Sequence, residues 1–109
     1  MRVSIVIAAY NEGEAAARTV ETCVDATYQL DCELVLADDA STDGSVQRVL
    51  RRFPMIQSLR HERRLGASAT IASGAQRARG EILTFLGAHI RAAVRLAASS
   101  STARARPAH

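Results

Sequence analysis

Short, nearly continuous apolar runs alternate with helical segments along the first ninety residues, and this alternation constrains the fold more than any other feature of the chain. The runs expected to be strands span residues 3–10, 33–37, 55–59 and 81–86. Strands that are apolar on both faces are typical of parallel sheets, which helices cover on each side. The sequence therefore predicts an α/β fold, a Rossmann-like parallel sheet of about four strands with flanking helices and right-handed crossovers.

Three segments between these runs show the apolar spacing that is typical of amphipathic helices. The expected helices span residues 12–28, 46–53 and 65–79. Pro54 ends the second helix and Gly80 closes the third, because proline cannot continue a helix and glycine favours the position just past a helix end. The turn at residues 41–45 leads into the second helix, with Thr42 or Asp43 as its expected cap.

The composition of the chain changes near its end. The 109 residues are 48% hydrophobic with a net charge of +3, which suits one compact domain, but no acid follows Glu81. Residues 91–109 are almost wholly Ala, Arg and Ser. We therefore expect an incomplete α/β domain at residues 1–90 and a frayed helix or disordered tail at residues 91–109. The tail is expected to be solvated rather than to bind a specific nucleic acid.

No apolar stretch approaches the roughly 18–20 residues that span a bilayer, and the N-terminal residues lack the core and cleavage site of a signal peptide. The sequence therefore predicts a cytoplasmic protein with no transmembrane segment. Cys23 and Cys32 lack the spacing of a zinc motif, so both are expected to be buried thiols.

Polar side chains follow three of the expected strands. Tyr10 and Glu12 follow the first, the pair Asp38 and Asp39 follows the second, and His89 follows the fourth. In an open parallel sheet, ligands bind beyond the carboxyl ends of the strands. An aromatic ring to stack a base, an acid to accept from it and a metal ligand for phosphates together predict a nucleotide site. Taken singly, the same residues also suit a surface aromatic, a turn or helix cap, and a polar strand end.

Three ordered stretches, VSIVIAAYNE, ELVLADDASTDGS and RRLGASATIASGAQRARGEILTFLGAH, resemble the N-terminal half of a family 2 glycosyltransferase with the GT-A fold. The resemblance covers residues 2 to about 90. The last stretch is especially similar to the branch that contains the polypeptide N-acetylgalactosaminyltransferases, in which this strand ends in Asp-x-His. The resemblance implies a truncated GT-A fold that carries the nucleotide-sugar donor-binding half.

Carried over by position, the resemblance also implies roles for the strand-end residues. Tyr10 and Glu12 would border the base and ribose, and Asp39 would accept a hydrogen bond from the base, usually uracil. Asp38 would be a structural partner for nearby backbone amides. His89 would hold Mn²⁺ or Mg²⁺ against the diphosphate of a nucleotide sugar, which is expected to be UDP-linked.

The chain also departs from the family pattern. Gly87 stands where the family usually has a metal-binding Asp, and Ile71 and Ala72 stand where an Arg-Asn pair is usual. The family's acceptor-binding half and catalytic base lie beyond position 109, so we assign no catalytic residue and expect this chain alone not to transfer sugar. These departures predict a truncated or frame-shifted gene.

Functions from other classes fit less well. A dinucleotide-binding oxidoreductase needs GxGxxG after the first strand, and a phosphorylation receiver needs a late lysine, which this lysine-free chain lacks. The alternative is a non-catalytic remnant, a nucleotide-binding or interaction module that self-associates through exposed surfaces. His61, with Arg60, Arg63 and Arg64, is expected to lie on a solvated face, and a diphosphate contact from Arg63 or Arg64 is the alternative.

Overall fold

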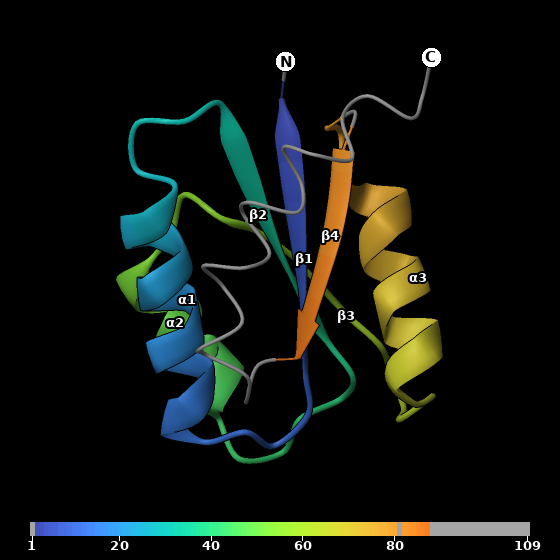
Figure 1. Cartoon of the computed structure of the whole chain (residues 1–109). Helices are drawn as coiled ribbons and strands as arrows, with labels where there is room; N and C mark the ends of the chain where they lie inside the picture. The colour runs from blue at the N-terminus through green and yellow to red at the C-terminus, as the bar shows by residue number, and fades with distance from the viewer. Residues whose placement is uncertain (1, 81, 88–109) are drawn as a thin grey trace.

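The computed structural model describes residues 2–80 and 82–87 and confirms the α/β prediction (Figure 1). Its elements are β1 (Val3–Ala9), α1 (Glu14–Ala26), β2 (Cys32–Asp38), α2 (Ser45–Arg52), β3 (Gln57–Arg60), α3 (Ala67–Arg77) and β4 (Ile82–Gly87). The strands form one sheet of order β3-β2-β1-β4, in which every neighbouring pair is parallel. None of the helices in this part of the chain is long and apolar enough to cross a membrane.

The register of the sheet brings the ends of the strands to one edge. Ala9, the last residue of β1, lies beside Asp38 of β2, and Asp38 lies beside Arg60 of β3. The pairing continues past the strands, because the Asp39 N–H donates to the Ala9 carbonyl oxygen at 2.9 Å. The His61 N–H likewise donates to the Asp38 carbonyl oxygen at 2.9 Å. The residues that follow β1, β2 and β3 are therefore held next to one another.

Helices cover both faces of the sheet, with α1 and α2 on one side and α3 on the other (Figure 1). Successive side chains of a strand point to opposite faces, so Ile5 and Ile7 of β1 join the core beneath α1 and α2. Val6 of β1 and Ala37 of β2 instead face α3 at Gly74. A Cβ atom on Gly74 would lie 2.3 Å from Val6 Cγ1. Glycine thus allows α3 to pack closely on the centre of the sheet.

Two of the expected helix ends are wrong. The residue before α2 is Gly44 in a left-handed conformation, and neither Thr42 nor Asp43 occupies the cap position. Asp43 acts one residue earlier, where its Oδ1 accepts from the Ser45 N–H at 2.9 Å and the Ser45 hydroxyl at 2.6 Å. The third helix stops at Arg77, so Gly80 does not close it. Gly80 is fixed by tertiary contacts, since its N–H donates to Ser4 Oγ at 2.7 Å.

The two cysteines are free thiols, and Cys23 is buried as expected. Burial raises the pKa of the Cys23 thiol to about 12, with a smaller contribution from Cys32 nearby. Cys32 is only half-buried at the start of β2, so the expectation of full burial is wrong for this residue. The expected tail at residues 91–109 and His89 lie outside the described residues.

Candidate functional site

A cavity lies at the edge of the sheet where the parallel strands end, which is where such sheets bind ligands. Its volume is about 290 Å³. It is lined by Ala8, Ala9, Tyr10, Glu12, Asp39, Arg64, Ala67, Thr70 and Ile71. Three residues that the sequence assigns to a nucleotide site, Tyr10, Glu12 and Asp39, therefore meet at one cavity.

Asp39 is the polar centre of this cavity wall. Its side chain is only 5% exposed, so its carboxylate must be satisfied by protein donors. Oδ1 accepts from the Leu65 N–H at 2.8 Å and lies 2.8 Å from His61 Nδ1, while Oδ2 accepts from the Gly66 N–H at 2.9 Å. The two backbone donors belong to the loop that leads into α3. Asp39 thus ties the end of β2 to the start of α3.

These hydrogen bonds stabilise the charged form of Asp39. Burial alone would raise the pKa of the carboxyl group, because it disfavours the charged form. Hydrogen bonds from His61, from the Leu65 and Gly66 N–H groups and from the Thr70 side chain outweigh burial and lower the pKa to about 2. The cavity therefore contains a fixed carboxylate, an acceptor with no proton of its own to donate.

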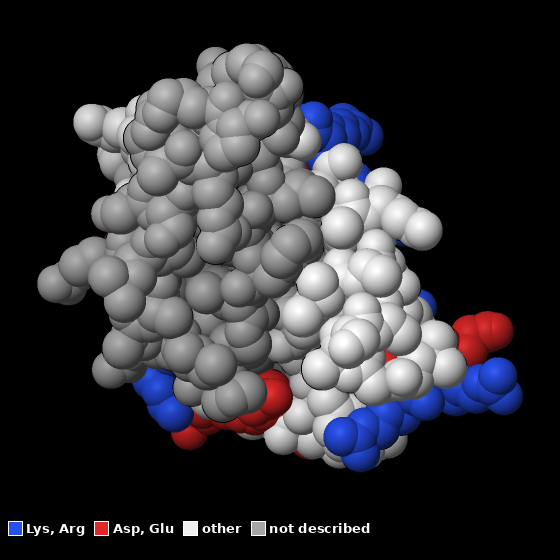
Figure 2. Space-filling model, turned by 45° about the vertical axis from the view of Figure 1, so that its right-hand side comes forward, with Lys and Arg blue, Asp and Glu red and all other residues white. Residues whose placement is uncertain are grey.

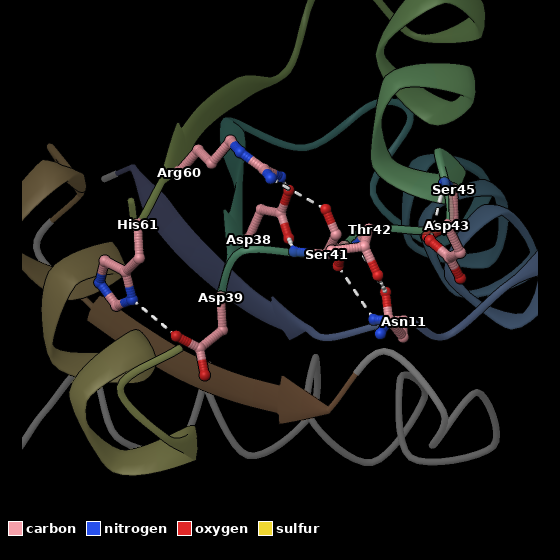
Figure 3. A network of polar contacts seen from close by, with 9 residues as sticks. All are labelled: Asn11, Asp38, Asp39, Ser41, Thr42, Asp43, Ser45, Arg60 and His61. Carbon is pink, nitrogen blue, oxygen red and sulfur yellow. Dashed lines mark hydrogen bonds and ion pairs between the residues drawn. The ribbon is translucent and has the colours of Figure 1, made fainter. Parts of the chain in front are cut away.

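Asp38, the other member of the pair, does not line the cavity. Its Oδ1 accepts from the Ser41 N–H at 2.9 Å, and its Oδ2 forms an ion pair with Arg60 at 2.5 Å (Figure 3). Arg60 also donates to the Ser41 carbonyl oxygen at 2.9 Å. The structure thus agrees with the expectation that Asp38 is a partner for nearby backbone groups. The guanidinium offsets the burial of this carboxylate, which would otherwise be costly.

Tyr10 and Arg64 form the aromatic side of the cavity. The Arg64 guanidinium carbon lies 4.0 Å from the centre of the Tyr10 ring, within the range of a cation–π contact. Glu12 and Asp39 line the same cavity as Arg64. The site therefore combines a ring face, one cation and two acids.

A second set of contacts fixes the loops after β1 and β2 to each other (Figure 3). The Asn11 N–H donates to Ser41 Oγ at 2.9 Å, and Asn11 Oδ1 accepts from the Thr42 N–H at 2.7 Å. Asn11 and Ala40 both adopt positive φ, at 48° and 66°. For alanine this conformation costs about 1 kcal/mol, which the surrounding hydrogen bonds must offset. The loop that carries Asp39 is therefore held rather than free.

The expectation that His61 lies on a solvated face is wrong. Its side chain is 11% exposed, and the ring bridges Asp39 and Ser73. The error has a physical origin, because β3 ends at Arg60 rather than at residue 59, so His61 directly follows a strand at the carboxyl edge. The rule that drew attention to the ends of the other strands also applies here, and it would have identified His61. The expectation holds for Arg60, Arg63 and Arg64, which are exposed, although Arg60 pairs with Asp38 and Arg64 lies over the Tyr10 ring.

The positions at which the sequence departs from the family pattern differ in their relation to the cavity. Ile71 lines the cavity, whereas Ala72 is not among its lining residues. Gly87 is the last residue of β4, and His89 lies outside the described residues. Within residues 2–80 and 82–87, no group of three or more His, Cys, Asp and Glu side chains could hold a metal ion.

Charged side chains gather along the lower edge of the molecule in Figure 2, which is the carboxyl edge of the sheet in the orientation of Figure 1. Blue and red groups lie next to one another there, so the edge carries no field of a single sign.

Comparison with known proteins gives a consistent family. A model of glycosyl transferase family 2 matches residues 4–94. Human polypeptide N-acetylgalactosaminyltransferase 16 is 35% identical over 88 residues, which are 79% of this chain and 16% of that protein. Polypeptide N-acetylgalactosaminyltransferase 4 of Caenorhabditis elegans is 35% identical over 89 residues, which are 80% of this chain and 15% of that protein. The chain thus spans about 16% of the length of the curated relatives that it matches.

Solved structures give the same fold. A mannosyltransferase from Pyrobaculum calidifontis, PcManGT, in complex with GDP-Man and Mn²⁺, matches 92% of this chain with a TM-score of 0.73 and 25% identity. The match covers 31% of that protein. Residues 1–349 of S. aureus TarS match 91% of this chain with a TM-score of 0.72 and 20% identity, over 32% of that chain. At that identity the second likeness concerns the fold alone.

Proposed function

Because this chain belongs to glycosyl transferase family 2, we propose that the cavity beside Asp39 binds the nucleotide of a nucleotide sugar, the donor of a sugar transfer. One observation carries the proposal, namely that the Tyr10 ring and the Asp39 carboxylate line the same cavity at the carboxyl edge of a parallel sheet. Its volume of about 290 Å³ is at the lower limit of ligand pockets, which suits a nucleoside better than a complete nucleotide sugar.

The base would be selected by the hydrogen bond that Asp39 can make. A carboxylate only accepts, so it favours a base edge that carries a ring N–H, such as that of uracil or guanine. At the corresponding position cytosine presents a bare ring nitrogen, which repels the carboxylate. The pKa of Asp39, lowered to about 2, supports an ionised acceptor at every pH near neutrality. We propose a UDP-linked donor, with Tyr10 against the base.

Glu12 and Arg64 would serve the rest of the nucleotide. Glu12 lines the cavity two residues beyond Tyr10, and its carboxylate suits the hydroxyl groups of a ribose. Arg64 is the cation in the cavity lining and suits a phosphate oxygen. Mn²⁺ or Mg²⁺, with His89 as the ligand that the family resemblance suggests, stays a prediction, and no contact proposed here depends on a metal. The proposal assigns no catalytic residue.

The proposal is tested by calorimetric titration of the whole chain with UDP, GDP and CDP, each with and without Mn²⁺. We expect UDP to bind, and Tyr10→Ala to weaken it about tenfold, the effect of losing one stacking contact. Tyr28→Ala is the matched control, because Tyr28 is 79% exposed and does not line the cavity. If wild-type protein takes up no nucleotide at millimolar concentration, or if both tyrosine variants weaken binding equally, the proposal is wrong.

A further inference from the structure

A chain of three polar side chains runs from the wall of the cavity through His61 to Ser73 of α3. His61 Nδ1 lies 2.8 Å from Asp39 Oδ1, and His61 Nε2 lies 2.8 Å from Ser73 Oγ. In Figure 3 the ring of His61 and the carboxylate of Asp39 point toward each other. His61 and Ser73 do not line the cavity, so they act on it only through Asp39. The nucleotide contacts proposed above do not use either residue.

The partners of His61 determine where its proton lies. The Asp39 carboxylate can only accept, so Nδ1 must carry the hydrogen of a neutral ring. Nε2 is then bare and accepts from the Ser73 hydroxyl. Serine in a helix often donates to the carbonyl four residues back, whereas Ser73 lies within hydrogen-bond distance of the histidine. A serine hydroxyl can donate or accept, so the Asp39 carboxylate sets the tautomer, and Ser73 holds the ring in its orientation.

This donor sets the direction of the Asp39 carboxylate. Oδ1 is occupied by His61 and the Leu65 N–H, whereas Oδ2 accepts from the Gly66 N–H. A carboxylate has about four acceptor sites, so Oδ2 keeps capacity for a donor from the cavity. The Thr70 hydroxyl, which lines the same cavity, donates its one hydrogen to the Gly66 carbonyl oxygen at 2.7 Å. It therefore leaves Oδ2 open to a base that enters the cavity.

We propose that His61 is a positioning residue for base selection, with Ser73 as its orienting partner, so that Asp39 presents Oδ2 to the ring N–H of a base and discriminates against cytosine. The inference rests on the proposed nucleotide site. It concerns discrimination rather than affinity alone, because a site built around one hydrogen bond rejects the analogue that cannot form it. Loosening of the loops would lower the affinity for every nucleotide by the same factor. A misdirected Asp39 carboxylate would instead lower the ratio of the CDP and UDP dissociation constants.

The test measures the ratio of the CDP and UDP dissociation constants for the whole chain. His61→Leu removes the donor and should lower the ratio about tenfold, the effect of one charge-assisted hydrogen bond. His61→Asn should keep the ratio within about threefold of wild type, because its amide nitrogen takes the place of Nδ1 and can still donate to Asp39. Ser73→Ala should lower it by about threefold, since the ring loses the hydrogen bond that holds its orientation while Nδ1 can still donate. Ser68→Ala is the matched control, an exposed serine on the same helix.

Nitrogen chemical shifts of the His61 ring provide a second measurement that needs no variant. The proposal requires the Nδ1–H tautomer in wild type, and it requires that Ser73→Ala keep Nδ1–H while the Nε2 shift changes through loss of the Ser73 donor. An Nε2–H tautomer in wild type, or an unchanged CDP to UDP ratio in His61→Leu, overturns the inference while leaving nucleotide binding intact. Absence of UDP binding to wild type overturns the proposed function and this inference with it.

Discussion

Each end of β2 has a carboxylate that accepts several hydrogen bonds, Glu33 at its start and Asp39 just past its end, but the two carboxylates have different surroundings. At the start of the strand, the Glu33 carboxylate accepts from the Ser4 hydroxyl at 2.7 Å, from the Gln57 side chain, and from the N–H groups of Arg79 and Gly80. These donors come from β1, from β3 and from the segment that enters β4. Glu33 therefore joins the strands of the sheet at its amino edge.

At the other end of β2, the donors to Asp39 come from the loop before α3 and from His61. An aromatic ring, a cation and a second acid line the cavity that this carboxylate faces. The amino edge has a larger hollow of about 670 Å³, which is lined by Arg2, Glu33, Gln57 and Arg79 as well as by the exposed side chains of Tyr28, Leu30 and Met55. There the Glu33 oxygens are taken up by four donors of the protein, whereas Asp39 lines its cavity beside an aromatic ring. The difference teaches that volume alone does not identify a site.

The largest effect is expected at the carboxyl edge. Asp39→Asn places an amide N–H₂ among donors that need an acceptor, so at least one partly buried donor loses its partner. We expect a loss of about 3 kcal/mol in the free energy of unfolding, together with loss of UDP binding. Urea unfolding followed by circular dichroism measures the first and calorimetry the second. A stable variant that still binds UDP would contradict the assignment of the nucleotide site to the Asp39 end of β2.

The next largest effect is expected at the amino edge. A Cβ atom on Gly80 would lie 2.3 Å from Ser4 Oγ and 2.7 Å from the Ser4 backbone nitrogen. Because backbone cannot yield as a flexible side chain does, Gly80→Ala should cost about 2 kcal/mol. UDP affinity measured at a temperature where the variant is folded should be unchanged. Unaltered stability would show that the β1–β4 junction is looser than described.

Glu33→Gln sharpens the comparison, because it is the counterpart of Asp39→Asn. The amide retains one acceptor oxygen and presents donors to the Ser4 hydroxyl and the Gly80 N–H, which should cost about 1 kcal/mol. Unfolding midpoints in urea measure this loss, while the UDP dissociation constant should stay at the wild-type value. Weaker UDP binding in this variant would mean that the two ends are coupled through the strand.

The smallest expected effect is a pH dependence of the stability that Glu33→Gln loses relative to wild type. Burial alone would raise the pKa of Glu33, but hydrogen bonds from Ser4, from the N–H groups of Arg79 and Gly80 and from Gln57 lower it below its usual value of 4.5. A carboxyl whose pKa is lowered by folding stabilises above the unfolded pKa and loses that contribution as pH falls. The stability difference between wild type and Glu33→Gln should therefore shrink below about pH 4.5. A difference that stays constant from pH 7 to pH 3 contradicts this role.

Much of the fold can be predicted from local sequence pattern. β1 and β2 are buried on both faces, and their nearly continuous apolar runs predict such strands. The positions of Tyr10, Glu12 and Asp39 follow from the same pattern, since residues after parallel strands must share an edge. β3 is only half-buried and is polar in sequence, with Gln57 and Ser58. The apolar pattern therefore predicts a strand end at residue 59 rather than at Arg60, and it does not identify His61 as a residue of the carboxyl edge.

Tertiary contacts that no local pattern records account for the other differences. Gly80 has the residue type of a helix end, but its surroundings are set by Ser4, 76 residues away. The Arg64 contact with Tyr10 likewise joins residues far apart in sequence. These contacts depend on the order of the strands in the sheet, which brings the segments together, so the local sequence does not predict them.

The most direct test of the nucleotide site is a titration of isotope-labelled chain with UDP, followed by amide chemical shifts. The account predicts shifts at Leu65, Gly66 and Thr70, whose groups surround Asp39, and none at Arg79 and Gly80 beside Glu33. Shifts confined to the Arg79–Gly80 end, or the absence of any shift at saturating UDP, would contradict the assignment of the nucleotide to the carboxyl edge.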